Sequence, residues 1–146
     1  MKNIIMILVS ALISMSTIAA VDRHDKSIDF KKLPKAAQEF VHLHFPDDKI
    51  VTVIADDMIK PDYTVSLSSG ATIDFMHNGS LEKVKVTTGS IPDAIVPNRI
   101  TNYVKEHYPD CRIVEYETDK THHEVKLSNQ VELNFSSDFA HVKIDD

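Results

Sequence analysis

The sequence predicts an α+β protein made of two tandem copies of one unit, each with a helix followed by four antiparallel strands. Residues 33–51 return as residues 96–114, 63 positions later, and residues 64–75 return as residues 124–135, 60 positions later. In both copies the apolar spacing changes from three or four residues to two. Short turn-forming segments separate the alternating stretches. Such an internal repeat indicates two copies of one supersecondary unit.

Residues 1–20 have the pattern of a cleaved signal peptide. A short basic start is followed by an apolar run from Ile4 to Met15 and then by small residues ending at Ala20. Cleavage after Ala19 or after Ala20 fits equally well. The apolar run is shorter than the roughly 20 residues that a spanning helix needs, although an uncleaved anchor is the alternative. We expect a periplasmic or secreted protein without stable membrane insertion after cleavage, and a disordered polar segment at residues 21–26.

Each copy is predicted to begin with a helix of about ten residues. Pro34 and Pro97 suit the first turn, where a backbone N–H is not needed. The pairs Phe45-Pro46 and Tyr108-Pro109 end the helices, because proline disfavours a helical residue before it. The spacing predicts these inward positions: Ala37, Phe40, Val41 and His44 in the first helix, and Ile100, Tyr103, Val104 and His107 in the second.

Four half-buried strands are predicted after each helix from alternation of apolar and polar residues. The hairpin turns fall at residues 68–70, 77–79 and 128–130. The predicted inward side chains of the first copy are Val51, Val53, Tyr63, Val65, Leu67, Ala71, Ile73, Phe75, Val84 and Val86. Those of the second copy are Val114, Tyr116, His123, Val125, Leu127, Val131, Leu133, Phe135, Val142 and Ile144.

The copies are assigned to residues 27–88 and 89–146. A unit of about 60 residues buries only about 60% of its unfolded surface, and the single cysteine, Cys111, excludes an intramolecular disulfide. We therefore expect the copies to share an interface and to be held stiffly by the linker at residues 87–96, which contains Pro92. Cys111 is interpreted as a tolerated, half-exposed residue.

Composition and motifs argue against several functions. The net charge of −6 disfavours nucleic acid, whose phosphates require clustered basic residues. Nucleophile elbows, HExxH motifs and glycine-rich phosphate loops are absent from the sequence, so no catalytic residue and no cofactor is assigned. His42 and His44 would point about 200° apart on a helix, and His122 and His123 alternate across a strand. No metal ligand is assigned, and His44 and His107 are interpreted as histidines whose charged form the helix dipole favours.

The strand residues opposite the apolar set form the candidate site. We expect this polar face either to be an ordinary solvated surface or to bind a protein or peptide of the cell envelope, with charges that orient the partner. Thr72, Glu115, Glu117 and His141 also lie in this pattern. The candidate partner-binding residues are Thr64, Ser66, Asp74, Lys83, Lys85, Glu124, Lys126, Glu132, Asn134 and Lys143.

Leu33-Pro34, Phe45-Pro46, residues 63–67, Gly70 and Ile73-Asp74-Phe75 follow a pattern that resembles the PepSY-like, β-lactamase-inhibitor-like exported proteins of Bacteroidetes. The second copy departs from it at Gln130, Asn134 and Phe139. The resemblance implies helices that back a sheet whose open face grips another protein, as in β-lactamase inhibitor protein. It implies a non-catalytic binding role outside the cytoplasm. This role includes binding that restrains an exported enzyme. The alternatives are a small-ligand or metal-responsive envelope sensor and a peptidase.

Overall fold

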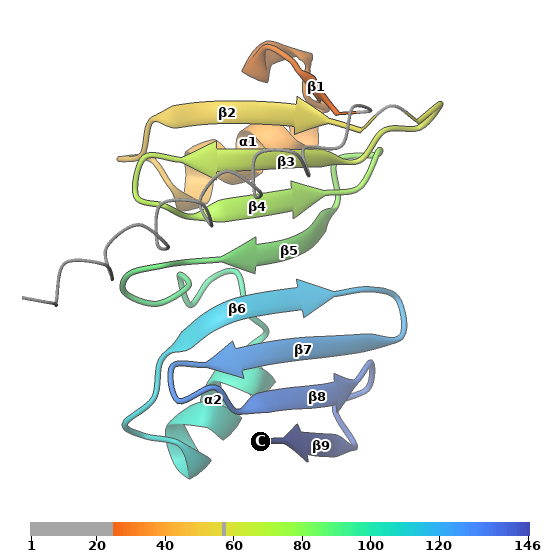
Figure 1. Cartoon of the computed structure of the whole chain (residues 1–146). Helices are drawn as coiled ribbons and strands as arrows, with labels where there is room; N and C mark the ends of the chain where they lie inside the picture. The colour runs from red at the N-terminus through yellow and green to blue at the C-terminus, as the bar shows by residue number, and fades with distance from the viewer. Residues whose placement is uncertain (1–24, 57) are drawn as a thin grey trace, which may run out of the picture.

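The computed structural model describes residues 25–56 and 58–146 (Figure 1). The predicted signal peptide at residues 1–20 lies outside the described residues, as does most of the segment at residues 21–26. No helix within the described part of the chain is long and apolar enough to cross a membrane.

The elements follow the predicted order twice. Each repeat consists of one helix and four strands, and both predicted ten-residue helices are present. The first repeat contains α1 (Lys35–His44), β2 (Ile50–Ala55), β3 (Tyr63–Leu67), β4 (Thr72–Phe75) and β5 (Leu81–Lys85). The second contains α2 (Asn98–His107), β6 (Ile113–Thr118), β7 (His122–Leu127), β8 (Glu132–Ser136) and β9 (Val142–Asp145).

The two repeats share one antiparallel sheet. Within the described residues this sheet has nine strands, which lie in sequence order from β1 to β9. At the junction, β5 of the first repeat pairs with β6 of the second, with Val84 opposite Tyr116. Both of these side chains are buried. The α+β prediction is confirmed, and the expected interface between the copies is a strand pairing in the middle of the sheet.

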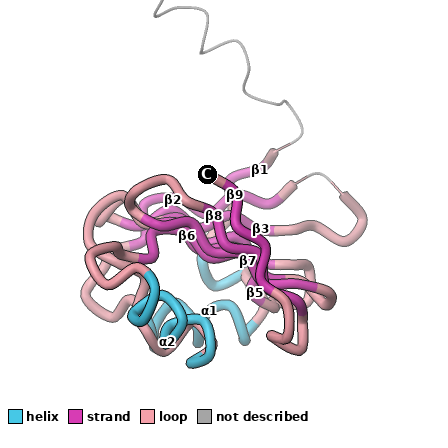
Figure 2. The backbone as a smooth tube through the Cα atoms, turned by 90° about the horizontal axis from the view of Figure 1, so that it is seen from below, coloured by secondary structure: helices cyan, strands magenta, loops and turns pink. Residues whose placement is uncertain are grey.

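Both helices cover the same face of the sheet (Figure 2). Phe40 of α1 packs edge to face on Phe75, with ring centroids 5.5 Å apart, and Tyr103 of α2 packs in the same way on Phe135 at 5.4 Å. Ile91 of the linker is also buried, and its N–H donates to Ile113 in β6. The linker therefore adds apolar contacts to the strand pairing that holds the repeats together.

Bulges overturn part of the predicted inward set. The pairing of β2 with β3 shifts register between Ile50 and Thr52, and Val51 is 62% exposed, although alternation predicts it inside. The corresponding shift in β6 falls between Ile113 and Glu115. There Ile113 and not Val114 joins the buried core. An extra residue in a bulge reverses the alternation on one side of it, which single-strand periodicity does not reveal.

Two further expectations about buried side chains are wrong. Ile144 in the edge strand β9 is 49% exposed, because no described strand pairs on its outer side. His107, at the last position of α2, is exposed and stacks on Tyr103 with ring centroids 4.0 Å apart.

The sheet begins with a strand that the sequence did not predict. β1 (Lys26–Ser27) pairs with β2, and Ile28 N–H donates to Val53 O at 2.9 Å. A 3-10 helix, η2 (Phe30–Lys32), follows. The expected disorder of residues 21–26 is thus wrong at Lys26. Two residues are too short for periodicity to register.

Candidate binding surface on the open face of the sheet

The polar face is the side of the sheet that faces away from α1 and α2 (Figure 2). The pairings align its side chains in two rows that cross both repeats. The first row, from β2 to β9, is Ile54, Thr64, Asp74, Lys83, Glu117, Glu124, Asn134 and Lys143. The second row is Thr52, Ser66, Thr72, Lys85, Glu115, Lys126, Glu132 and Asp145.

Ion pairs join the two repeats at the centre of this face. Lys83 Nζ lies 2.5 Å from Glu115 Oε1 and 3.7 Å from Glu117 Oε2, so one ammonium group of β5 contacts two carboxylates of β6. The hydrogen bond to Glu115 raises the pKa of Lys83. Lys85 Nζ lies 3.9 Å from the same carboxylate. The junction is therefore matched in charge: two lysines on β5 face two glutamates on β6.

The acidic charge of the second repeat is less well matched. Glu117 stands directly opposite Glu124, and like charges in that position destabilise a sheet. Partial burial and then the charge of Glu132 raise the pKa of Glu124. Burial, followed by Asp62 and Asp74, likewise raises the pKa of Glu82. Glu117 contacts Lys83, and Glu132 contacts Lys126 at 3.2 Å. Among the described residues, Glu124 and Glu82 are carboxylates of this face that lack an ion-pair contact with a lysine.

We expect Glu124→Gln to stabilise the protein at pH 7 by a few tenths to about 1 kcal/mol, since it removes a like-charge pair. A raised pKa in the folded state means that folding favours the protonated carboxyl. The stabilisation from the protonated Glu124 carboxyl is fully present below the pKa that this group has in the unfolded chain. It is lost as the pH rises through the raised pKa of the folded protein. The gain should therefore disappear near pH 3. Urea unfolding at both pH values measures it, with exposed Glu39→Gln as the control; equal gains at both pH values would contradict it.

The structure places all ten candidate residues on this one face, in adjacent strands. Their role in binding stays a prediction. Sequence reasoning missed Glu82 and Asp145. Asp145 follows Lys143 by two residues, so alternation could have found it. Glu82 faces the same side as Lys83 because β5 is irregular next to the position where Asp74 pairs, and no sequence signal marks that bulge.

The histidines have separate surroundings. Burial lowers the pKa of His44 and so opposes the charged form that the helix dipole is expected to favour. His123 lies inward, as predicted, stacked on Phe139 with its Nδ1 2.8 Å from Tyr116 Oη. His122 Nδ1 instead lies 2.9 Å from Asp119 Oδ2. Within residues 25–56 and 58–146, no group of three or more His, Cys, Asp or Glu side chains is placed to hold a metal ion.

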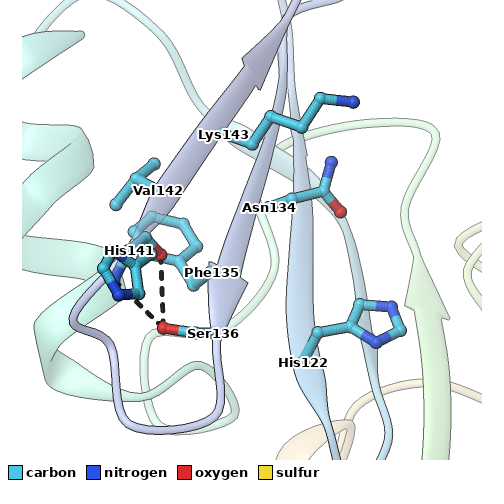
Figure 3. Close-up of a pocket in the computed structure, with 7 residues that line it drawn as sticks. All are labelled: His122, Asn134, Phe135, Ser136, His141, Val142 and Lys143. Carbon is cyan, nitrogen blue, oxygen red and sulfur yellow. Dashed lines mark hydrogen bonds between the residues drawn. The ribbon is translucent and has the colours of Figure 1, made fainter.

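A hollow near the end of the polar face contains a serine and two histidines (Figure 3). It is lined by His122, Asn134, Phe135, Ser136, His141, Val142 and Lys143. Ser136 Oγ contacts the backbone N–H and C=O of His141 and donates to Asp138 Oδ1, rather than to an imidazole. A nucleophilic serine needs a hydrogen bond to a general base, and this arrangement does not provide one.

The fold and this surface define a class of protein: two α+β repeats share one antiparallel sheet, with helices on one face and an opposite, charged face that no helix of the described residues covers. The chain belongs to the PepSY-like family, whose model, described as "Putative beta-lactamase-inhibitor-like, PepSY-like", matches residues 19–60 and 61–143. The predicted resemblance is confirmed. No curated protein matches the chain.

Solved structures of Bacteroides proteins have the same fold. A Bacteroides thetaiotaomicron protein, described as a "putative calcium-regulated periplasmic protein", is 36% identical with a TM-score of 0.80, covering 84% of this chain and 97% of that one. A Bacteroides vulgatus protein of the DUF2874 family is 35% identical with a TM-score of 0.80, covering 85% and 98%. A second B. vulgatus protein, of unknown function, is 26% identical with a TM-score of 0.78, covering 84% and 99%.

These neighbours are described as periplasmic proteins. The predicted periplasmic or secreted location is confirmed.

Proposed function

We propose that this protein binds a protein or peptide of the cell envelope through the polar face of its sheet, without catalysis, and that it restrains an exported enzyme in this way. The observation that carries the proposal is the directly opposed pair Glu117 and Glu124 within a charged face that neither helix covers. The inhibitor-like description of the family supports a binding role.

The charge of the face favours a basic partner. Proteins depart from the rules of stability mainly at functional sites, and an opposed glutamate pair is such a departure. A lysine or arginine of a partner placed between Glu117 and Glu124 would remove their repulsion. Glu132, whose charge also raises the pKa of Glu124, would add to the attraction. Charge complementarity of this kind sets the orientation and the association rate of a complex.

Affinity capture from the envelope fraction with the immobilised mature chain tests the proposal. We expect a retained protein that the double variant Glu124→Lys, Glu132→Lys binds at least ten-fold more weakly, because two attractive charges become repulsive. The control is Asp47→Lys with Glu106→Lys, the same charge change at exposed positions outside the sheet. Equal capture by the double variant and by the wild type would show that the binding site lies outside the polar face.

The second candidate is a metal-responsive sensor, which the description of the B. thetaiotaomicron relative as calcium-regulated favours. Calcium binds to clusters of carboxylate and carbonyl oxygens. The described residues hold no preformed cluster of this kind, but Glu132 and Glu117 are among the carboxylates whose charges raise the pKa of Glu124. Titration calorimetry with calcium, zinc and copper separates the two candidates. Heat at micromolar calcium that Glu124→Gln abolishes would favour the sensor over the protein-binding function.

A further inference from the structure

The two repeats differ in what covers their last strand. β5 and β9 occupy equivalent positions: Val84 is opposite Ile73 in β4, and Ile144 is opposite Leu133 in β8. Val84 is fully buried because β6 pairs beside it, whereas Ile144 is 49% exposed. Within the described chain β9 is the last strand of the sheet. The outer edge of β9 is therefore unpaired within the described chain, whereas the equivalent edge of β5 pairs with β6.

The backbone of this edge can accept another strand. Ser136 N–H donates to His141 O at 3.0 Å, so His141, Lys143 and Asp145 direct their backbone groups at β8. In an antiparallel ladder alternate residues point to opposite sides. Val142 and Ile144 consequently direct their N–H and C=O groups outward. Unpaired edge groups of this kind are a template for pairing with another chain.

The side chains of β9 indicate which strand can pair with this edge. β5 carries Lys83, Val84 and Lys85, which match Glu117, Tyr116 and Glu115 of β6. β9 carries Lys143, Ile144 and Asp145 at the equivalent positions. This triplet complements itself when two copies run antiparallel about Ile144, because Lys143 of each copy then faces Asp145 of the other.

We propose that two copies of this chain associate through β9, with Ile144 on the two-fold axis, to form one continuous antiparallel sheet. A two-fold contact uses the same patch on both molecules, as this triplet requires. The pairing buries both Ile144 side chains and gives their outward N–H and C=O groups partners. Lys143 Nζ, now 3.1 Å from Asp145 in its own chain, gains a second carboxylate. The two polar faces become one surface.

The contact is small, since β9 has four residues. Interfaces that bury less than about 1,200 Å² are weak or transient, so we expect a dimer with a dissociation constant on the order of 0.1 mM. Its charge pairs are exposed to solvent, and salt should therefore weaken it. The dimer is populated where the protein is concentrated, and at low micromolar concentration the protein is monomeric.

Sedimentation velocity of the mature chain between about 10 µM and 1 mM at low salt tests the proposal. We expect Asp145→Lys and Lys143→Asp each to weaken self-association at least ten-fold, because like charges then meet across the axis. An equimolar mixture of the two variants should restore association, since each lysine meets an aspartate again. Asp47→Lys is the charge-matched control, and circular dichroism confirms that each variant is folded.

The mixture distinguishes the pairing from a loss of structure in either variant. A wild-type chain that stays monomeric at 1 mM would overturn the proposal. So would a dimer that both charge variants retain, which would place the contact elsewhere on the molecule. Amide exchange adds a direct readout: the N–H of Ile144 should become protected as the concentration rises, and concentration-independent exchange there would also contradict the proposal.

Discussion

Replacement of Phe75 by alanine should lower the free energy of unfolding by about 3–5 kcal/mol, the usual cost of removing a buried aromatic ring. Phe75 is fully buried in β4, and its ring contacts Phe40 of α1. The loss therefore removes packing between the sheet and the helix of the first repeat. Since β5 and β6 form one ladder, we expect both repeats to unfold in a single transition at the lower denaturant concentration.

Guanidinium unfolding followed by far-UV circular dichroism measures this effect. Tyrosine fluorescence adds a probe weighted to the second repeat, which holds Tyr103, Tyr108 and Tyr116, whereas the first repeat holds Tyr63. Leu43→Ala is the control, because Leu43 lies on α1 but is 74% exposed and its removal should change stability by less than about 0.5 kcal/mol. Two separated transitions, with only the first repeat affected, would show that the repeats are independent domains.

Replacement of Gly79 by alanine should cost about 2–3 kcal/mol, because a strained backbone and a steric overlap act together. Gly79 has φ +86, and a Cβ added to it would lie 2.8 Å from Pro34 Cβ and 3.3 Å from Ala36 Cβ. The turn after β4 thus packs directly on the start of α1. A side chain there would push the helix away from the sheet.

Gly89→Ala separates the two causes. Gly89 also has a positive φ, +69, but no atom lies within 4 Å of the added Cβ, so only the backbone cost of about 1 kcal/mol applies. Thermal unfolding of both variants gives the comparison. Equal losses would contradict the steric explanation and leave the backbone conformation as the only cause.

The second repeat shows why such a glycine is not required everywhere. Phe139 occupies the position equivalent to Gly79 with φ +59, and its ring stacks on His123 with Arg99 5.9 Å from its centroid. Its side chain therefore packs between α2 and the sheet. Gln130 at the position of Gly70 likewise adopts φ +77. These two residues keep the turns while departing from the family pattern of the first copy.

The sequence predicts those parts of the fold that depend on local periodicity. Alternation identified Val65, Ile73 and Phe75 as inward residues, and all three are fully buried. It failed at Val51, because a bulge in the pairing of β2 with β3 reverses the alternation there. A bulge is a property of two strands together, and one strand's pattern does not contain it.

The candidate surface could be predicted only as a set of residues and not as an arrangement. Alternation placed Glu124 and Lys83 outward, but it could not show that Glu124 stands opposite Glu117 or that Lys83 contacts two carboxylates of the other repeat. Those relations depend on register and on the pairing of β5 with β6. The same limit hid the open edge at Ile144, which sequence periodicity assigns to the core.

Amide hydrogen exchange across the β5–β6 junction tests most directly whether the two repeats form one sheet with a single polar face. Val86 N–H donates to Val114 O at 2.9 Å. That amide and the amides of β6 that pair with β5 should exchange only through global unfolding, as slowly as those in β3 and β7. Fast exchange confined to this junction, with strong protection on either side, would mean that the copies are separate units and that no continuous face exists.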